Sequence, residues 1–155
     1  MSHWVHVAAV VRLDALRING ESFVDDIKAY FGKSTDDYPC DWENDESLAA
    51  YGKAVEDSYD HPDEWLPGGS EGTCSMQVWE NPDKSCLAAY TVSIFGDLRD
   101  VDTGDDVLKW FEKKLSDEAL DGQRFFVRQA VVSVEEEYTG KIQTWTWGGE
   151  KEGES

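Results

Sequence analysis

Basic residues are scarce in this 155-residue chain, and their scarcity excludes several kinds of partner. Lysine and arginine together number 14 against 33 aspartates and glutamates, which gives a net charge of −19. Binding to nucleic acid or to an anionic membrane surface needs basic residues that neutralise phosphates, so we expect no direct nucleic-acid or membrane partner. A strong negative field instead attracts cationic partners, above all a basic protein.

Cysteines and long apolar runs are few as well. The chain has three cysteines and no C-x-x-C pair, so neither a disulfide framework nor a structural zinc site is indicated. Cys74 and Cys86 share strand parity with apolar neighbours and are expected in the core. No apolar stretch approaches the roughly 18 residues of a membrane span, and no signal-peptide pattern opens the sequence. We therefore expect a soluble protein of the reducing cytoplasm, without cofactor or metal.

The apolar residues that are present suffice for one packed domain. They make up 40% of the chain, and aromatic residues make up 12%, so full disorder is excluded. We expect a single α+β domain over residues 1–147, an acidic insertion at about 35–70, and a flexible tail over 148–155 that is rich in glycine and glutamate.

The hydrophobic periodicity predicts five strands and two main helices. Alternating apolar residues indicate strands over 3–13, 73–80, 86–95, 125–135 and 141–147. One helix is expected after Ser22, with Asp25 completing a capping box, and another after Thr103. The first six elements follow the ferredoxin-like, or split βαβ, pattern, in which both helices cover one face of an antiparallel sheet. The last strand would extend one edge of that sheet.

The negative charge is concentrated between residues 35 and 64. This stretch holds 11 acidic residues against Lys53 alone, a net charge of −10, whereas the other 125 residues share −9. A short helix is expected over 45–57. One interpretation is a solvated excursion that keeps the protein soluble. Four aromatic residues within the stretch and Trp65 directly after it favour an interaction surface, because such rings either pack the segment down or anchor a partner. The residues predicted to bind a partner are Asp36, Asp37, Asp41, Trp42, Glu43, Asp45 and Glu46.

A glycine-rich loop follows the acidic stretch. The run from Gly68 to Gly72 matches the G-x-S-x-G pattern of hydrolase nucleophiles, but it lacks the preceding strand and the following helix that such a nucleophile needs. A structural turn is favoured, or a nest of backbone amides that holds an anion. The candidate anion or ligand residues are Gly68, Gly69, Ser70 and Gly72.

Metal ligation has little support in the sequence. His3 and His6 lie three residues apart on a strand and therefore point to opposite faces. The aspartates between 97 and 106 do not keep the register of an EF-hand, because Gly104 falls at the fifth position of a loop that starts at Asp100. Helix capping explains these acids, and a weak divalent-cation site is the alternative.

Several aromatic side chains fall on the face of the sheet that the helices would leave open. Strand parity places Trp4 with His6, and Trp79 with Ser75 and Gln77. Stacking on RNA would need basic companions, so a protein partner or a second copy of the chain fits better. The alternative is that the acidic insertion folds back over these rings. The candidate open-face contacts are Trp4, His6 and Trp79.

Two short strings carry a resemblance to known proteins. They are Trp79-Glu80-Asn81-Pro82-Asp83-Lys84-Ser85 and Ile94-Phe95-Gly96-Asp97-Leu98-Arg99-Asp100, which resemble small uncharacterised proteins encoded by phages and prophages of Gram-positive bacteria. The resemblance covers about half of the chain and leaves out the acidic stretch. It implies a setting, the cytoplasm of a host cell, and no catalytic residue. Small acidic phage proteins resemble, as a class, inhibitors of host nucleic-acid enzymes and defence systems.

These features together favour a non-catalytic binding protein whose acidic surface engages a basic site on a host protein. In its strongest form, the carboxylates mimic the charge of a nucleic acid and inhibit a nucleic-acid enzyme or a defence system. The alternative is a small-ligand, nucleotide-like binding protein that uses the open sheet face and the loop at 68–72. Enzymatic activity ranks last, because no spacing singles out a pair of carboxylates for acid–base or metal chemistry.

Overall fold

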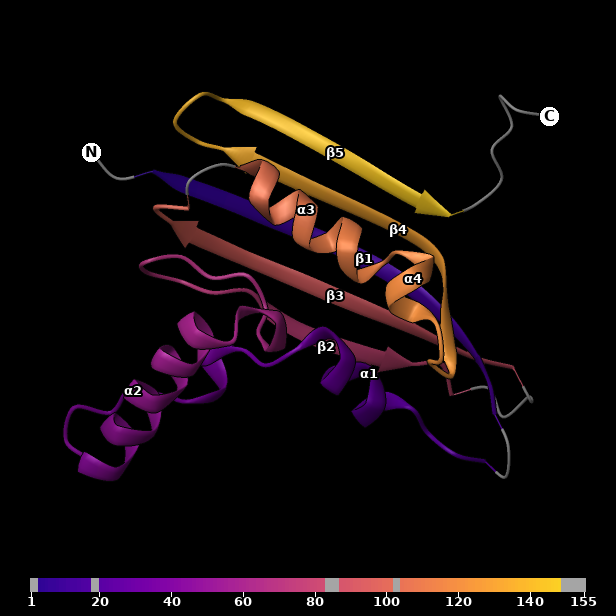
Figure 1. The fold of residues 1–155 in the computed structure, drawn as a ribbon, viewed down its shortest axis with the longest axis horizontal. Coiled ribbons are helices and arrows are strands. Elements are labelled where there is room, and N and C mark those ends of the chain that lie inside the picture. Colours follow the sequence, from indigo (N-terminus) through magenta and orange to yellow (C-terminus); the bar gives the residue numbers. More distant parts are fainter. Residues whose placement is uncertain (1–2, 18–19, 83–86, 102–103, 149–155) are drawn as a thin grey trace.

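Five antiparallel strands form one open sheet in the order β2-β3-β1-β4-β5 (Figure 1). The computed structural model describes residues 3–17, 20–82, 87–101 and 104–148. The strands are β1 (Trp4–Leu16), β2 (Ser75–Glu80), β3 (Leu87–Arg99), β4 (Phe125–Glu136) and β5 (Lys141–Gly148). The helices are α1 (Val24–Phe31), α2 (Asp45–Asp60), α3 (Gly104–Lys114) and α4 (Asp117–Leu120), with short 3-10 turns at Thr35–Asp37 and Pro62–Glu64. The chain therefore has an α+β fold.

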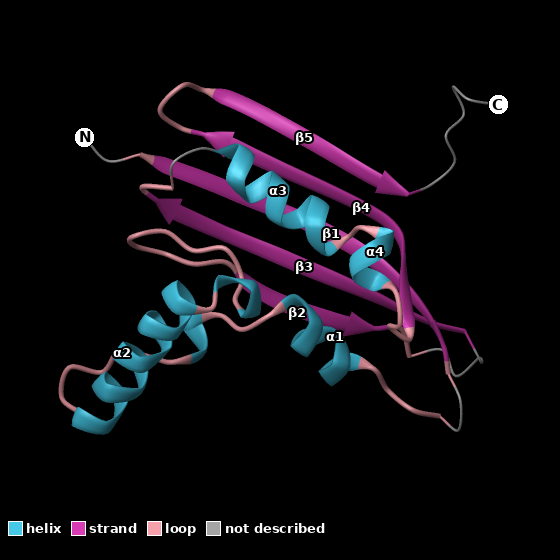
Figure 2. Ribbon diagram, in the orientation of Figure 1, coloured by secondary structure: helices cyan, strands magenta, loops and turns pink. Residues whose placement is uncertain are grey.

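The core lies between the sheet and the helices α1, α3 and α4, which cover the same face (Figure 2). The central strand β1 alternates along its length, and its buried residues from Val5 to Leu13 meet Ile27 and Phe31 of α1 and Phe111 of α3 in one cluster. This alternation is the expected one for a strand with one covered face. No helix of the described residues covers the other face of the sheet (Figure 2).

The strands keep the predicted order, but two of them are longer than expected. β1 and β3 pair continuously from Trp4 opposite Arg99 to Leu16 opposite Leu87, so each continues beyond the alternating segment that the sequence shows. The bounds of β4 and β5 match the prediction to within one residue at each end. Cross-strand pairing thus extends regular structure where the local pattern has already faded.

The helices differ from expectation in extent and number. α2 runs on to Asp60, because Gly52 stands in open space on an exposed surface and ends nothing. The one-turn helix α4 was not predicted; Ser116 caps it by accepting a hydrogen bond from the Ala119 amide at 3.2 Å. Cys86, Thr103 and the tail from residue 149 lie outside the described residues. Among the residues that are described, no helix combines the length and the apolar character needed to cross a membrane.

The expected capping box at the start of α1 is wrong. Phe23 occupies the N-cap position, and no side chain of the helix itself caps it. Instead the Phe23 amide donates to the hydroxyl of Tyr90 at 3.0 Å, and that hydroxyl donates to Glu80 at 2.7 Å. Tyr90 is fully buried. Ser22 still accepts a hydrogen bond from the Val24 amide at 3.4 Å. The amide of the N-cap residue Phe23 is held by the long-range hydrogen bond to Tyr90, which ties α1 to β3.

Cys74 confirms its predicted place in the core. Its side chain is fully buried on the strand side that faces the helices. Burial raises the pKa of the thiol to about 12, so the group stays protonated and unreactive at neutral pH.

We expect the change Tyr90→Phe to lower the free energy of unfolding by about 1–2 kcal/mol, because it leaves the Phe23 amide without its acceptor. Urea denaturation followed by circular dichroism measures this. Tyr59→Phe is the matched control, since its ring is 70% exposed, and its midpoint should stay that of the unaltered protein. An equal midpoint for both variants would contradict the role assigned to Tyr90.

Candidate functional site

Residues 35–64, here called the acidic arm, form an ordered excursion built around α2 (Figure 1). Asn44 caps α2 by accepting a hydrogen bond from the Ser47 amide at 3.0 Å. Asp45 and Glu46 occupy the first turn of α2, where the helix dipole favours negative charge. Ala54 is the one residue of α2 that is buried, so the helix offers most of its surface to solvent.

The arm is fixed to the domain at its two ends, which meet. The Lys33 amide donates to the Glu64 carbonyl at 3.0 Å, and the Leu66 amide donates to the Lys33 carbonyl at 2.8 Å. These two hydrogen bonds join the start and the end of the arm. Gly32 permits this approach, because a Cβ atom there would lie 3.0 Å from the Glu64 carbonyl oxygen. Trp65 is buried beside this junction and its indole nitrogen donates to Asp57 at 2.7 Å. The base of the arm is therefore rigidly held.

The five aromatics of this region divide between the two roles that the sequence left open. Trp65 is buried and its ring lies 6.0 Å from that of Tyr38, while Tyr51 is half-buried. Trp42 is 82% exposed and Tyr59 is 70% exposed. The first group packs the arm against the domain, and the second group is free to meet another molecule. Sequence spacing alone does not separate the groups, because both sit among acids.

Some of the predicted partner-binding acids have structural tasks. Asp36 accepts a hydrogen bond from the Ser75 hydroxyl at 2.7 Å, which ties the arm to the edge strand β2. Asp37 accepts from the Ser34 amide at 3.3 Å and completes a capping box. Asp41 accepts from the Glu43 amide at 3.0 Å. The exposed side chains of Trp42, Glu43, Asp45 and Glu46 remain as the predicted contacts that no such bond occupies in the described part of the chain.

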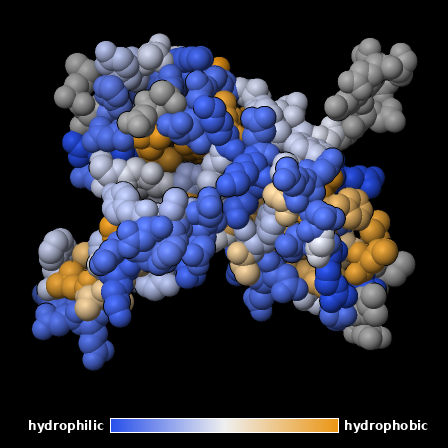
Figure 3. All heavy atoms as spheres, in the orientation of Figure 1, coloured by the Kyte–Doolittle hydropathy of each residue, from blue (hydrophilic) through white to orange (hydrophobic). Residues whose placement is uncertain are grey.

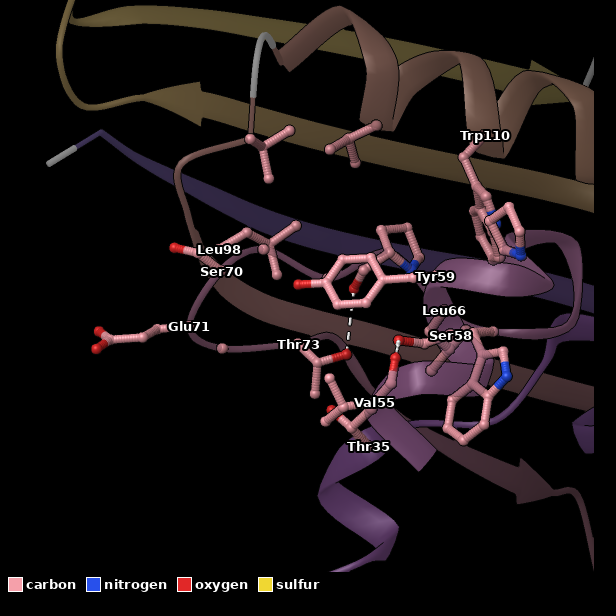
Figure 4. Close-up of a pocket in the computed structure, with 18 of the residues that line it drawn as sticks. Thr35, Val55, Ser58, Tyr59, Leu66, Ser70, Glu71, Thr73, Leu98 and Trp110 are labelled. Carbon is pink, nitrogen blue, oxygen red and sulfur yellow. Dashed lines mark hydrogen bonds between the residues drawn. The ribbon is translucent and has the colours of Figure 1, made fainter. Parts of the chain in front are cut away.

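A cavity of about 360 Å³ lies between the arm, the loop at 67–73 and α3 (Figure 4). Aromatic and aliphatic side chains form most of its wall: Tyr51, Val55, Tyr59, Trp65 and Leu66 from the arm side, and Leu98, Val101, Val107 and Trp110 from the domain. Figure 4 shows the Tyr59 ring extending across it and the Glu71 carboxylate pointing away from it. Hydrophobic residues are visible in a recess of the helix-bearing face in Figure 3. No lysine or arginine of the described residues lines this cavity.

The glycine-rich loop borders this cavity but does not form the expected open nest. The Gly69 amide donates to the Gly72 carbonyl at 3.0 Å, and the Ser70 amide donates to the Arg99 carbonyl at 2.8 Å. A Cβ atom at Gly69 would lie 2.2 Å from the Arg99 carbonyl oxygen, so the loop lies flat against the end of β3. Close packing explains Gly69, and the amides of Gly69 and Ser70 are bonded within the protein and so are not offered to an anion. Gly68 and Gly72 line the cavity.

Ser70 is not activated as a nucleophile. Its hydroxyl donates to Asp100 at 3.1 Å and lies 3.3 Å from the Arg99 carbonyl. No histidine contacts it among the described residues, and the loop is followed by β2 instead of a helix. The structural interpretation of the G-x-S-x-G match is therefore the correct one.

A second hollow, of about 700 Å³, lies on the open sheet face beside the arm. Its border includes Asp36, Gly72, Phe95, Asp97 and Glu135. The charged groups around it are acidic apart from His6. This hollow occupies the place where the nucleotide-like alternative expects its ligand, but its charge opposes a phosphate.

His6 links β1 to β3 and to the turn after β4, at the edge of that hollow. Its Nδ1 lies 2.6 Å from Asp97 and its Nε2 lies 2.7 Å from Glu137, so both ring nitrogens donate when the imidazole is protonated. The hydrogen bond with Asp97, then that with Glu137, raise the pKa of His6 above its ordinary value. Trp79 is exposed on the same face of the edge strand β2, and Trp4 is half-buried.

The aspartates of the 97–106 run are distributed among separate partners. Asp97 contacts His6, Asp100 accepts from the His3 amide at 3.2 Å, and Asp105 accepts from the Gln143 side chain at 2.8 Å. Within the described ranges, no group of three or more histidine, cysteine, aspartate or glutamate side chains is placed to hold a metal ion.

No known protein-family model matches the chain, and no curated protein matches it. Among solved structures, a phage SAM lyase in complex with S-methyl-5'-thioadenosine aligns over 96% of this chain and 92% of its own. The two chains share 11% sequence identity, with a TM-score of 0.36. Likeness at that level identifies neither a family nor an activity for this chain.

We expect His6 to titrate above 6.5, its ordinary pKa value. The folded state then binds the proton more tightly than the unfolded state, so the stabilisation is complete below pH 6.5 and is lost as the pH rises through the pKa of the folded protein. Proton NMR of the imidazole ring measures the value. Asp97→Asn should move it down, whereas the distant control Asp117→Asn should not. A His6 pKa below 6.5 in the unaltered protein would contradict the geometry.

Proposed function

We propose that the chain is a non-catalytic binding protein whose acidic arm engages a basic site on another protein. The observation that carries this proposal is the exposed Trp42 beside the free carboxylates of Glu43, Asp45 and Glu46, on an arm that is held rigidly at its base. An exposed indole surrounded by charges of one sign is the composition of an interaction hot spot with a charged rim. A preformed arm also avoids the entropy cost of ordering a loop on binding.

The charge of the arm specifies the partner further. A surface of net charge −10 over residues 35–64 matches a site that normally holds phosphates. We propose that the partner is a nucleic-acid-binding protein of the host cell, an enzyme or a defence component, and that the arm inhibits it by mimicking nucleic-acid charge. The resemblance to phage and prophage proteins supports this setting.

A ferredoxin-like classification belongs with this proposal. The strand order β2-β3-β1-β4-β5 and its antiparallel pairing support a split βαβ unit that is extended by β5. In this arrangement the arm is an insertion between α1 and β2, at the edge of the sheet. An insertion at that place alters the surface of the protein without disturbing the central strands.

The cavity between the arm and α3 favours a second candidate function, the binding of a small molecule. Its wall is aromatic, no lysine or arginine of the described chain lines it, and the whole protein carries −19. These conditions disfavour a nucleotide and favour an organic cation with an apolar part, which aromatic faces attract. This replaces the nucleotide-like ligand of the open face.

The role of the arm in binding is tested by replacing its carboxylates with amides of nearly the same size. The triple variant Glu43→Gln, Asp45→Asn, Glu46→Gln should lose about tenfold in affinity for the captured partner, because rim charges steer and hold a basic surface. Capture from a lysate of a Gram-positive bacterium, with release by salt and identification by mass spectrometry, supplies the partner. Binding of the purified partner to each variant is then measured by calorimetry.

The matched control removes the same number of charges far from the arm, by Glu112→Gln, Glu118→Gln and Asp121→Asn. This control should bind the partner as the unaltered protein does, and Trp42→Ala should bind more weakly even at high salt. Equal losses in both triple variants would mean that only net charge matters. That result, or a lysate from which nothing basic is captured, would overturn the proposal.

The cavity is tested by thermal shift with benzyltrimethylammonium as the probe and AMP as its anionic counterpart. We expect the cation to raise the Tm and to change tryptophan fluorescence, and we expect AMP to do neither, because the cavity repels phosphate. Tyr59→Ala should reduce the shift, whereas Tyr138→Ala, on the turn between β4 and β5, should leave it intact. A Tm that rises with AMP alone would contradict the assignment.

A further inference from the structure

The face of the sheet opposite the helices, here called the open face, is unusually poor in charge for this protein. Charged residues make up 30% of the chain. From the row of Arg12 to the row of Ala8, the cross-strand register places one charged residue, Arg12, on the open face together with these uncharged ones: Ala8, Val10, Gln77, Thr91, Ser93, Phe95, Gln129, Val131, Ser133, Thr144 and Thr146. Depletion of charge is the compositional signal of an interface core.

Apolar side chains stand exposed in the middle of this face. Phe95 is 52% exposed, Val10 45% and Val131 42%, and they lie on the three central strands. Val10 stands directly opposite Val131, and Ala8 stands opposite Phe95. Contiguous apolar groups with a border of hydroxyls mark a surface that another protein covers.

The charges at the two ends of the open face have opposite sign. One end is the cross-strand row of Asp97, His6 and Glu135, to which Glu137 adds a further carboxylate beside His6. Towards the other end lies the row of Thr91, Arg12 and Gln129, beyond which Asp14 is buried and paired with Arg128. Arg12 is exposed, and no residue of the described chain gives it a hydrogen bond or an ion pair. An unpaired arginine is conspicuous in a chain with 33 acids.

We propose that two copies of the chain pack their open faces together about a two-fold axis that lies between the sheets and runs perpendicular to the strands. This operation reverses the strand direction, so the row of Arg12 in one copy covers the row of His6 and Glu135 in the other. The apolar residues Val10 and Phe95 meet at the centre. The same contact forms twice, as a self-complementary interface requires.

The charge pattern selects this axis over its alternative. A two-fold axis parallel to the strands would keep each row in place, so Arg12 would face Arg12 of the second copy and Glu135 would lie in a row that faces acids. Like charges across an interface cost free energy. The perpendicular axis instead gives Arg12 the carboxylate of Glu135 from the second copy, and Asp97 remains with His6.

The open face is large enough for such a contact. Five strands at a spacing of about 4.8 Å, and about eight residues at roughly 3.3 Å each, give a face of roughly 25 by 25 Å, or about 600 Å² from each copy. The total of about 1,200 Å² reaches the lower limit of specific, stable interfaces. The cavity beside α3 is not part of this face, and of the residues assigned to partner binding only Asp36 borders it. The dimer therefore does not depend on the proposed function.

Sedimentation velocity at micromolar concentration tests the proposal with two charge-reversal variants. The unaltered protein should sediment with the mass of two chains. Arg12→Glu and Glu135→Arg should each sediment as single chains, because each places like charges together twice. An equimolar mixture of the two variants should recover the dimer, since both contacts of the mixed pair then join opposite charges.

Lys109→Glu is the matched control, because it makes the same charge change on an exposed residue of α3, on the helix-bearing side. It should remain a dimer. Circular dichroism confirms that each variant is folded, and recovery in the mixture excludes misfolding as the cause of dissociation. A single-chain mass for the unaltered protein, a dimer of Arg12→Glu, or a mixture that stays monomeric would each overturn the proposal.

Discussion

Everything in this protein depends on the pairing of β1 along both of its edges. β3 on one side and β4 on the other follow β1 over nearly its whole length. That pairing fixes which side chains face the helices and which face outward, because a shift by one residue would exchange the two sets. The core, the exposed apolar centre of the open face and the position of His6 all follow from this register.

A second constraint is the electrostatic cost of holding a net charge of −10 within thirty residues. Backbone hydrogen bonds between Lys33, Glu64 and Leu66 hold the base of the arm together against this repulsion. Trp65 adds a buried anchor, and the Lys33 ammonium lies 5.4 Å from the centre of its ring. Most of the acids point into water, where their mutual repulsion is screened. The repulsion therefore shapes the surface and leaves the core undisturbed.

Local sequence patterns predicted the parts of the fold that local physics decides. The five strands, the two main helices and the helix in the arm follow from the periodicity of the apolar residues. The pattern failed where a distant residue intervenes. The Tyr90 hydroxyl replaced the expected cap of α1, and the end of β3 determined the shape of the glycine-rich loop.

The candidate site was predictable to a smaller extent. Trp42 and the neighbouring acids stood out by composition, and their exposure agrees with the predicted surface. The bond of Asp36 could not be foreseen, because its partner Ser75 lies far along the chain. The bond of Asp37 belongs to a local capping box with Ser34, which the sequence analysis missed. The cavity beside α3 was missed for the same reason: its wall combines α2, the loop and α3, which are separated in sequence.

The outer edge of β5 has a consequence for the behaviour of the protein in acid. Within the described chain β5 pairs only with β4, so the other side of Lys141–Gly148 presents unpaired backbone groups. Such an edge can template the addition of strands from other molecules. At neutral pH the large negative charge keeps molecules apart, and in acid the protonated carboxylates no longer do. The acidic residues that dominate the sequence thus also prevent aggregation through β5, although β5 itself contains no acidic residue.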